Sequence, residues 1–167
     1  MELIQNKVAE SGLITIDLER YLPEDTMVLI DLKQFLFMQM ILKEKEFREQ
    51  LDQHDWSAYT QKDVVVHCTV DAIIPMWAYM LITNRLSAYA RTVYTGTPEE
   101  AIKQKTIHAI QSIDIEQYRD KRVVIKGCGE KEVPNYAYAE ITNLLSPVVK
   151  SLMYGEACST VPVYKRK

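Results

Sequence analysis

The feature that most constrains the fold of this sequence is an internal repeat. Residues 55–96 align with residues 114–155 without a gap, at a constant offset of 59 positions, and fourteen aligned positions are identical. An ungapped match of this extent predicts a duplicated structural unit, and repeats have to be recognised before a fold is assigned. The identical pairs are Asp55/Asp114, Tyr59/Tyr118, Lys62/Lys121, Val64/Val123, Val65/Val124, Pro75/Pro134, Ala78/Ala137, Tyr79/Tyr138, Ile82/Ile141, Thr83/Thr142, Asn84/Asn143, Leu86/Leu145, Ser87/Ser146 and Gly96/Gly155.

Each copy of the repeat reads as a strand, a helix and a second strand. The first strands, 64–67 and 123–126, are runs of β-branched residues bounded by charges, as buried strands usually are. Apolar residues then recur at helical spacing after Pro75 and Pro134. Second strands follow at 92–95 and 151–154. Because strand–helix–strand units are almost always right-handed crossovers, we predict two superimposable units, each with a parallel pair of strands.

The rest of the chain completes an α/β pattern. We expect strands at 11–18 and 27–30, and helices at 33–52 and 98–111. No linker, low-complexity tract or domain boundary is visible. The prediction is a single α/β domain over residues 1–167, with a mixed or mostly parallel sheet and helices packed on it.

Composition excludes several classes of protein. With 47% hydrophobic and 26% charged residues, the chain has the content of an ordinary globular protein. Its net charge of −3 provides no general attraction to nucleic acid. The longest apolar run, near residues 35–38, is far too short to cross a membrane. The sequence also lacks a recognisable signal peptide, and three cysteines, an odd number, favour a reducing compartment. We therefore expect a cytoplasmic protein with no nucleic-acid or membrane partner.

All three cysteines follow predicted strands. Cys68 and Cys128 come just after 64–67 and 123–126, and Cys158 comes just after 151–154. If these strands are parallel, the three sulfurs share one edge of the sheet, where ligand sites gather in α/β folds. Three thiolates suit zinc or an iron–sulfur cluster. His67, Asp71, Glu156 or an exogenous group could supply a fourth ligand, and Asp71 is the best placed.

Two other interpretations remain open for these cysteines. A thiolate at a strand end beside a helix N-terminus would be reactive, so one of the three could be the nucleophile of an enzyme that handles sulfur or redox equivalents. Alternatively, the cysteines could be small buried hydrophobes in a non-catalytic scaffold that binds a partner. The sequence does not decide whether the protein is an enzyme.

The chain resembles a known family over essentially its whole length. The resemblance is carried by residues 13–18, 54–56, 75–80, 124–128 and 153–162, and the family is the domain of unknown function 2480 (DUF2480) of Bacteroidetes. The resemblance implies a bacterial cytosolic protein with no accepted activity. It also implies an association with iron–sulfur cluster assembly proteins as partners, which favours the metal interpretation of the cysteines.

The predicted helix at 33–52 bears on assembly. Phe35, Phe37, Met38, Met40 and Ile41 place apolar residues on more than one of its faces, which suggests burial on two sides. We therefore expect a homodimer.

Overall fold

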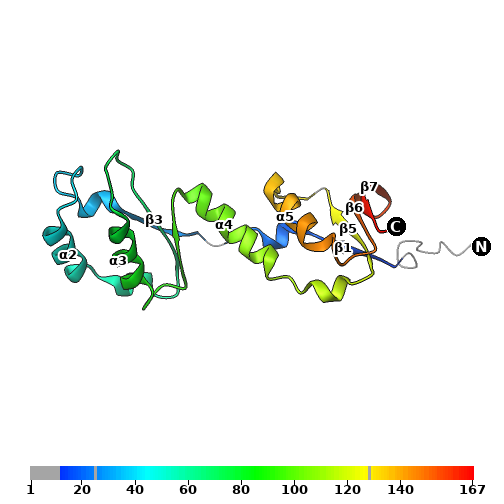
Figure 1. Cartoon of the computed structure of the whole chain (residues 1–167), viewed down its shortest axis with the longest axis horizontal. Coiled ribbons are helices and arrows are strands. Elements are labelled where there is room, and N and C mark those ends of the chain that lie inside the picture. Colours follow the sequence, from blue (N-terminus) through cyan, green and yellow to red (C-terminus); the bar gives the residue numbers. More distant parts are fainter. Residues whose placement is uncertain (1–11, 25, 128) are drawn as a thin grey trace, which may run out of the picture. The chain divides into compact units, whose positions relative to one another are not determined.

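The computed structural model describes residues 12–24, 26–127 and 129–167, and the chain divides into two compact units. We call residues 23–104 the inserted unit, because this segment is continuous. Residues 1–22 and 105–167 form the split unit, whose two parts flank the inserted unit in the sequence. The boundary at 104/105 falls within helix α4 (Pro98–Gln111), which therefore belongs to both. In Figure 1 the split unit holds both the blue strand β1 and the red strand β7.

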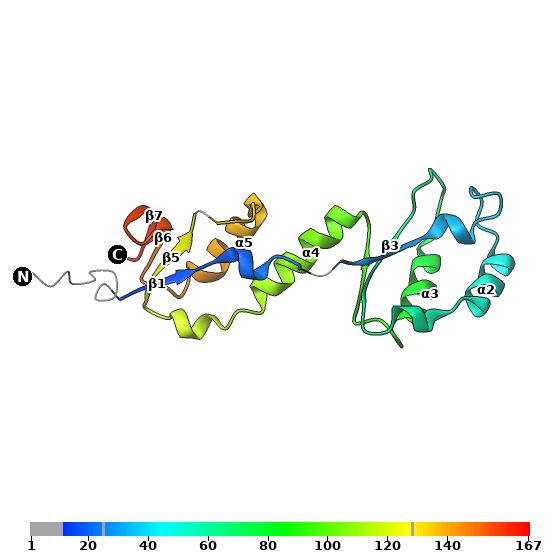
Figure 2. The same ribbon diagram turned by 180° about the vertical axis from the view of Figure 1, so that it is seen from behind.

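The inserted unit is a three-stranded parallel sheet with helices on one face. Its strands β2 (Val28–Asp31), β3 (Asp63–His67) and β4 (Thr92–Thr95) are in the order β2-β3-β4. Helices α2 (Glu44–Gln53) and α3 (Met76–Leu86) lie on the same side of β3 in Figures 1 and 2. Two 3-10 helices, η2 (Leu32–Phe35) and η3 (Trp56–Tyr59), complete the unit.

The split unit has the same arrangement with one strand added. Strand β1 (Leu13–Ile16) pairs with β5 (Arg122–Lys126), which pairs with β6 (Ser151–Glu156), and all three are parallel. Strand β7 (Ser159–Lys165) then adds antiparallel to β6. Helix α5 (Asn135–Leu145) packs on the sheet, with 3-10 helices η1 (Leu18–Tyr21) and η4 (Ile115–Tyr118) beside it.

The predicted α/β class and the two parallel pairs are confirmed. Strands β3 and β4 run parallel, as do β5 and β6, at the positions expected from the repeat. The expected helix at 98–111 also forms as α4. The strands differ from the prediction in one respect, because they form two sheets rather than one. The single domain over residues 1–167 stays a prediction, since the two units share α4.

The strands of the two units pair in equivalent registers. Val64 is opposite Val93 in the inserted unit, and Val123 is opposite Leu152 in the split unit. Val123 and Leu152 lie 59 positions after Val64 and Val93, which is the offset of the repeat. The agreement extends to the first strand of each unit, where Ile30 is opposite Val66 and Ile16 is opposite Ile125. An origin by duplication remains an interpretation of this correspondence.

Packing explains many of the residues that recur in both copies. Ala78, Ile82 and Leu86 of α3 are fully buried against β3, and Ala137, Ile141 and Leu145 of α5 are fully buried in the split unit. Full burial of each Ile or Leu side chain contributes about 1.5–3 kcal/mol. The two cores thus use the same positions of the repeat.

Turns explain two further pairs of recurring residues, Asp55/Asp114 and Gly96/Gly155. Asp55 and Asp114 accept backbone hydrogen bonds that begin η3 and η4, at 3.0 and 3.1 Å from the nitrogens of Ser57 and Glu116. Gly96 and Gly155 have φ values of 109° and 121°, a conformation that residues with a Cβ rarely adopt. Backbone geometry thus accounts for the recurrence of these aspartates and glycines, and no function needs to be assigned to them.

The helix predicted at 33–52 is wrong for its first part. Phe35 ends η2, and Phe37 pairs with Ile41 across a tight turn in which Met38 and Gln39 have φ values of 49° and 58°. Helix α2 begins only at Glu44. Phe35 and Leu36 are buried, while Met38 is 77% exposed at the tip of the turn. The apolar run is therefore a segment that enters the core at Phe35 and Leu36 and then leaves it. The homodimer that was inferred from a helix here stays a prediction.

Candidate functional site

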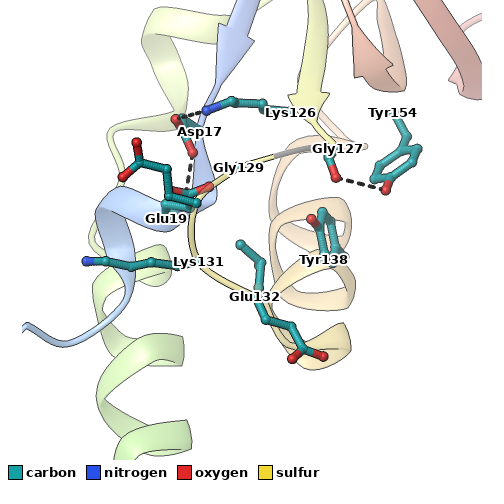
Figure 3. A pocket seen from close by; sticks show the side chains of 11 residues that line it. Asp17, Glu19, Lys126, Gly127, Gly129, Lys131, Glu132, Tyr138 and Tyr154 are labelled. Atoms are coloured by element: carbon teal, nitrogen blue, oxygen red, sulfur yellow. Dashed lines mark hydrogen bonds and ion pairs between the residues drawn. The ribbon is translucent and has the colours of Figure 1, made fainter.

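A pocket lies at the carboxyl edge of the split unit's sheet. It has a volume of about 520 Å³ and is open to solvent. Strands β1, β5 and β6 each contribute to it at or near their carboxyl ends, which is where parallel α/β sheets bind ligands. The loop from β5 to α5 forms one wall (Figure 3). The lining residues are Asp17, Glu19, Lys126, Gly127, Gly129, Glu130, Lys131, Glu132, Val133, Tyr138 and Tyr154.

An ion pair between the first two strands fixes one side of this pocket. Asp17 directly follows β1, and its Oδ1 accepts a hydrogen bond from the backbone nitrogen of Glu19 at 3.1 Å, which begins η1. Its Oδ2 lies 2.8 Å from Nζ of Lys126, the last residue of β5. Mainly through this hydrogen bond, the pKa of Asp17 is lowered and the pKa of Lys126 is raised. Both side chains are therefore charged at neutral pH.

Two tyrosines form the opposite side. Tyr154 of β6 donates a hydrogen bond from its hydroxyl to the carbonyl oxygen of Gly127, at 3.2 Å. Its ring makes an edge contact with Tyr138 of α5, with centroids 5.7 Å apart. A Cβ at Gly127 would lie only 2.8 Å from the ring carbon Cζ of Tyr154. Glycine at this position is what allows the loop to pass so close to the ring.

The pocket carries more negative than positive charge. Four carboxylates line it, together with two lysines, and one lysine, Lys126, is already paired with Asp17. A ligand here would meet carboxylates, phenol groups and a backbone loop rather than an apolar wall. The arrangement is suited to a small polar molecule.

The inserted unit has a pocket at the equivalent edge. Its volume is about 430 Å³, and His67, Cys68 and Tyr79 line it. His67 and Tyr79 are the repeat equivalents of Lys126 and Tyr138. Asp31 takes the place of Asp17: it accepts backbone hydrogen bonds from Lys33 and Thr69 at 3.0 and 3.2 Å. Burial would raise the pKa of Asp31, but its hydrogen bonds with Thr69 and Lys33 outweigh burial and the pKa is lowered.

The structure places the predicted ligands in both units. Cys68 follows β3 in the inserted unit, is half-buried and donates a hydrogen bond to the carbonyl oxygen of Val70 at 3.4 Å. Asp71 is exposed in the same loop. Cys158 is an exposed free thiol between β6 and β7 in the split unit. Cys128 lies outside the described residues, although its neighbours Gly127 and Gly129 both line the larger pocket.

The premise of one shared sheet edge does not hold for all three cysteines. Cys68 follows a strand of the three-stranded sheet, whereas Cys128 and Cys158 follow strands of the four-stranded sheet. Within residues 12–24, 26–127 and 129–167, no group of three His, Cys, Asp or Glu side chains could hold a metal ion. Since Cys128 is not among these residues, the three-cysteine site with Asp71 stays a prediction.

Sequence reasoning missed the pair that shapes the larger pocket. Asp17 and Lys126 are 109 positions apart, so no local pattern connects them. One signal was available, because Ile16-Asp17-Leu18 recurs as Ile30-Asp31-Leu32, each at the end of a strand. The recurrence marks a structurally equivalent acidic residue at each sheet edge.

The fold and the pocket define an α/β protein built from parallel strand–helix–strand units, with a polar pocket at a sheet edge. The chain belongs to the family described as protein of unknown function (DUF2480), whose pattern matches residues 2–166. Comparison with curated proteins and with solved structures finds no match. In the described part of the chain, no helix is long and apolar enough to span a membrane.

Proposed function

We propose that the protein is a thiol-dependent, sulfur-handling protein that uses Cys128 and Cys158 at the carboxyl edge of the split unit. The observation that supports this most is a register. Lys126 is opposite Gly155 in the parallel pair β5–β6, so the segments that carry Cys128 and Cys158 leave neighbouring strands at the same edge. The larger pocket lies between residues of these strands and gives a sulfur donor access to that edge.

The proposed reaction has two balanced steps. The thiolate of Cys128 attacks the outer sulfur of a persulfide donor, R–S–SH, which yields a persulfide on Cys128 and releases the donor thiolate R–S⁻. The thiolate of Cys158 then attacks the inner sulfur of that persulfide. This step forms a disulfide between the two cysteines and expels hydrosulfide. The exposed position of Cys158 suits a resolving thiol that meets a partner or acceptor.

Treatment of the reduced protein with inorganic polysulfide, followed by mass spectrometry, tests the proposal. We expect one added sulfur atom on Cys128 and then a Cys128–Cys158 disulfide. Cys158→Ser should let the persulfide accumulate, and Cys128→Ser should abolish it. Cys68→Ser is the matched control, since this half-buried cysteine belongs to the other unit. Equal sulfur uptake by the protein with Cys128→Ser would contradict the proposal.

The metal- or cluster-binding function is a second proposal, and it makes a different demand. Soft thiolates favour zinc or iron–sulfur clusters, and two of the three cysteines follow strands of one sheet. A three-cysteine site requires Cys68, whereas the thiol pair does not. Metal and acid-labile sulfide analysis of protein purified without oxygen distinguishes the two, because Cys68→Ser should remove the metal only if the three-cysteine site exists. A cytoplasmic location and iron–sulfur assembly partners are supported only by the cysteine usage and the family resemblance.

A further inference from the structure

The two units differ at one edge of their sheets. In the split unit, β7 pairs antiparallel with β6 and covers its outer edge. The equivalent strand of the inserted unit is β4, which is the last strand of its sheet. Among the described strands, none pairs with the outer side of β4. An uncovered strand edge presents backbone donors and acceptors that can pair with another chain.

Apart from its short length, β4 lacks the features that usually prevent such pairing. Its four residues, Thr92 to Thr95, include no proline, lysine or other charge. The neighbouring Arg91 is held in a bidentate pair with Asp63 of β3, on the inner side of the strand. By contrast, the exposed edge strand β7 contains Pro162 and Lys165, and its register with β6 is shifted at one point. Proline, lysine and irregular register are ways in which edge strands avoid association.

The backbone of β4 indicates how a partner strand would align. The nitrogen of Gly96 donates to the carbonyl oxygen of Val66 on β3. Because backbone groups alternate in direction along a strand, the N–H and C=O groups of Val93 and Thr95 point away from β3. A second β4 running antiparallel satisfies these groups when Val93 is opposite Thr95 of the second copy, and Thr95 opposite its Val93.

This register is self-complementary about a two-fold axis. It places Tyr94 directly opposite Tyr94 of the second copy, as a non-hydrogen-bonded pair. Tyrosine and β-branched residues at opposing positions favour antiparallel pairing. The side chain of Val93 packs on the core of the inserted unit, so Tyr94 projects to the other face of the sheet.

We propose that β4 is a dimerisation edge, which pairs antiparallel with β4 of a second copy of this chain and joins the two three-stranded sheets into one. The proposal is independent of the thiol function. A strand of four residues buries much less surface than a standard interface of roughly 1,600 Å². The dimer should therefore dissociate in the micromolar range or above.

Sedimentation velocity of the full chain, from low micromolar to submillimolar concentration, tests the dimer first. The wild-type protein should shift from monomer to dimer across this range. Thr95→Pro removes the outward N–H and leaves the bonds to β3, so it should weaken dimerisation about tenfold or more, because two symmetric hydrogen bonds are lost. Thr95→Val is the matched control and should retain the dimer. A wild-type protein that stays monomeric throughout would overturn the proposal.

Disulfide cross-linking tests the register in chains whose native cysteines are replaced by serine. Opposing residues of a non-hydrogen-bonded pair have Cα atoms about 4.5 Å apart, within the range that a disulfide requires. Tyr94→Cys should therefore give an oxidised dimer. Thr92→Cys should not, since the register places Thr92 opposite Gly96 of the second copy. Two outcomes would place any dimer interface elsewhere. One is cross-linking at neither position. The other is a dimer that is weakened by Met38→Glu, in the turn between Phe37 and Ile41, and not by Thr95→Pro.

Discussion

Arg91 forms a bidentate ion pair with the buried carboxylate of Asp63, at the start of β3. Its Nε and Nη2 atoms lie 2.8 Å from the two carboxylate oxygens of Asp63, whose side chain is only 3% exposed. Repeat equivalence places Arg122 and Lys150 at these two positions of the split unit, so that unit has no such pair there. The Arg91–Asp63 pair is thus a charge interaction specific to the inserted unit.

Loss of Arg91 should destabilise the protein more than loss of a surface ion pair. Arg91→Ala leaves the Asp63 carboxylate without its bidentate partner, and we expect the free energy of unfolding to fall by about 2–3 kcal/mol. This loss is smaller than for a fully buried pair, because Arg91 is 47% exposed. Glu44→Ala breaks the exposed Arg48–Glu44 pair and should cost about 0.5 kcal/mol. Urea unfolding followed by circular dichroism measures both. Equal costs would contradict this interpretation.

Equivalent core substitutions in the two units test the single-domain prediction. Ile82→Ala and Ile141→Ala each create a cavity at a fully buried position and should each cost about 2–4 kcal/mol. If the chain unfolds as one domain, both substitutions lower the midpoint of the same transition. If the two units unfold separately, calorimetry shows two transitions, and each substitution lowers the midpoint of only one of them. Met80→Ala, at a position 71% exposed, serves as the control and should have little effect.

The Asp17–Lys126 pair should make stability depend on pH in acid. The hydrogen bond that Lys126 donates to Asp17 lowers the pKa of Asp17 below the ordinary value of 3.8. A carboxyl group with a lowered folded pKa stabilises the protein above its unfolded pKa, and the contribution is lost as the pH falls through the folded value. In a double-mutant cycle with Asp17→Asn and Lys126→Met, the coupling free energy should be present at pH 6 and decrease as the pH is lowered from 3.8 towards 2. A coupling that stays constant over this range would refute the assignment.

Because Gly127 lies close to the ring of Tyr154, a substitution of Tyr154 should restore part of the stability that is lost when Gly127 is substituted. Gly127→Ala places a methyl group against the tyrosine ring, and overpacking of this kind costs about 1–3 kcal/mol. Tyr154→Ala removes the obstacle, so the double substitution should be more stable than the sum of the two single effects implies. Thermal or urea unfolding of the four proteins measures this coupling. Strict additivity would show that the ring does not limit this position.

The sequence allowed the repeated strands and helices to be predicted because their signals are local. Val64 and Val123 begin β-branched runs, and Pro75 and Pro134 stand just before helices whose buried residues recur at helical spacing. The segment after Phe35 misled the same reasoning, because a continuous apolar run can be a turn that dips into the core as well as a helix. Strand β7 was missed, since Pro162 lies within it and proline is typical of edge strands only.

The candidate site could be predicted only in part. Position after a strand correctly placed Cys68 and Cys158 at sheet edges, but it could not assign them to different sheets. Sheet membership depends on contacts between distant segments, such as β1 with β5 and β2 with β3. The pocket formed by Asp17, Lys126 and Tyr154 depends on the same contacts. No spacing within the sequence encodes them.

The insertion of one unit into the other sets an order for folding during synthesis. Residues 23–104 hold every strand of their own sheet, so this unit can close as soon as β4 has left the ribosome. Strand β1 has no partner strand until β5 is made. Lys126 follows Asp17 by 109 positions, so their ion pair cannot form for roughly 5–20 s at translation rates of about 5–20 residues per second. During this interval β1 has no strand to pair with, so its apolar residues stay unpacked on the nascent chain although the inserted unit can already be folded.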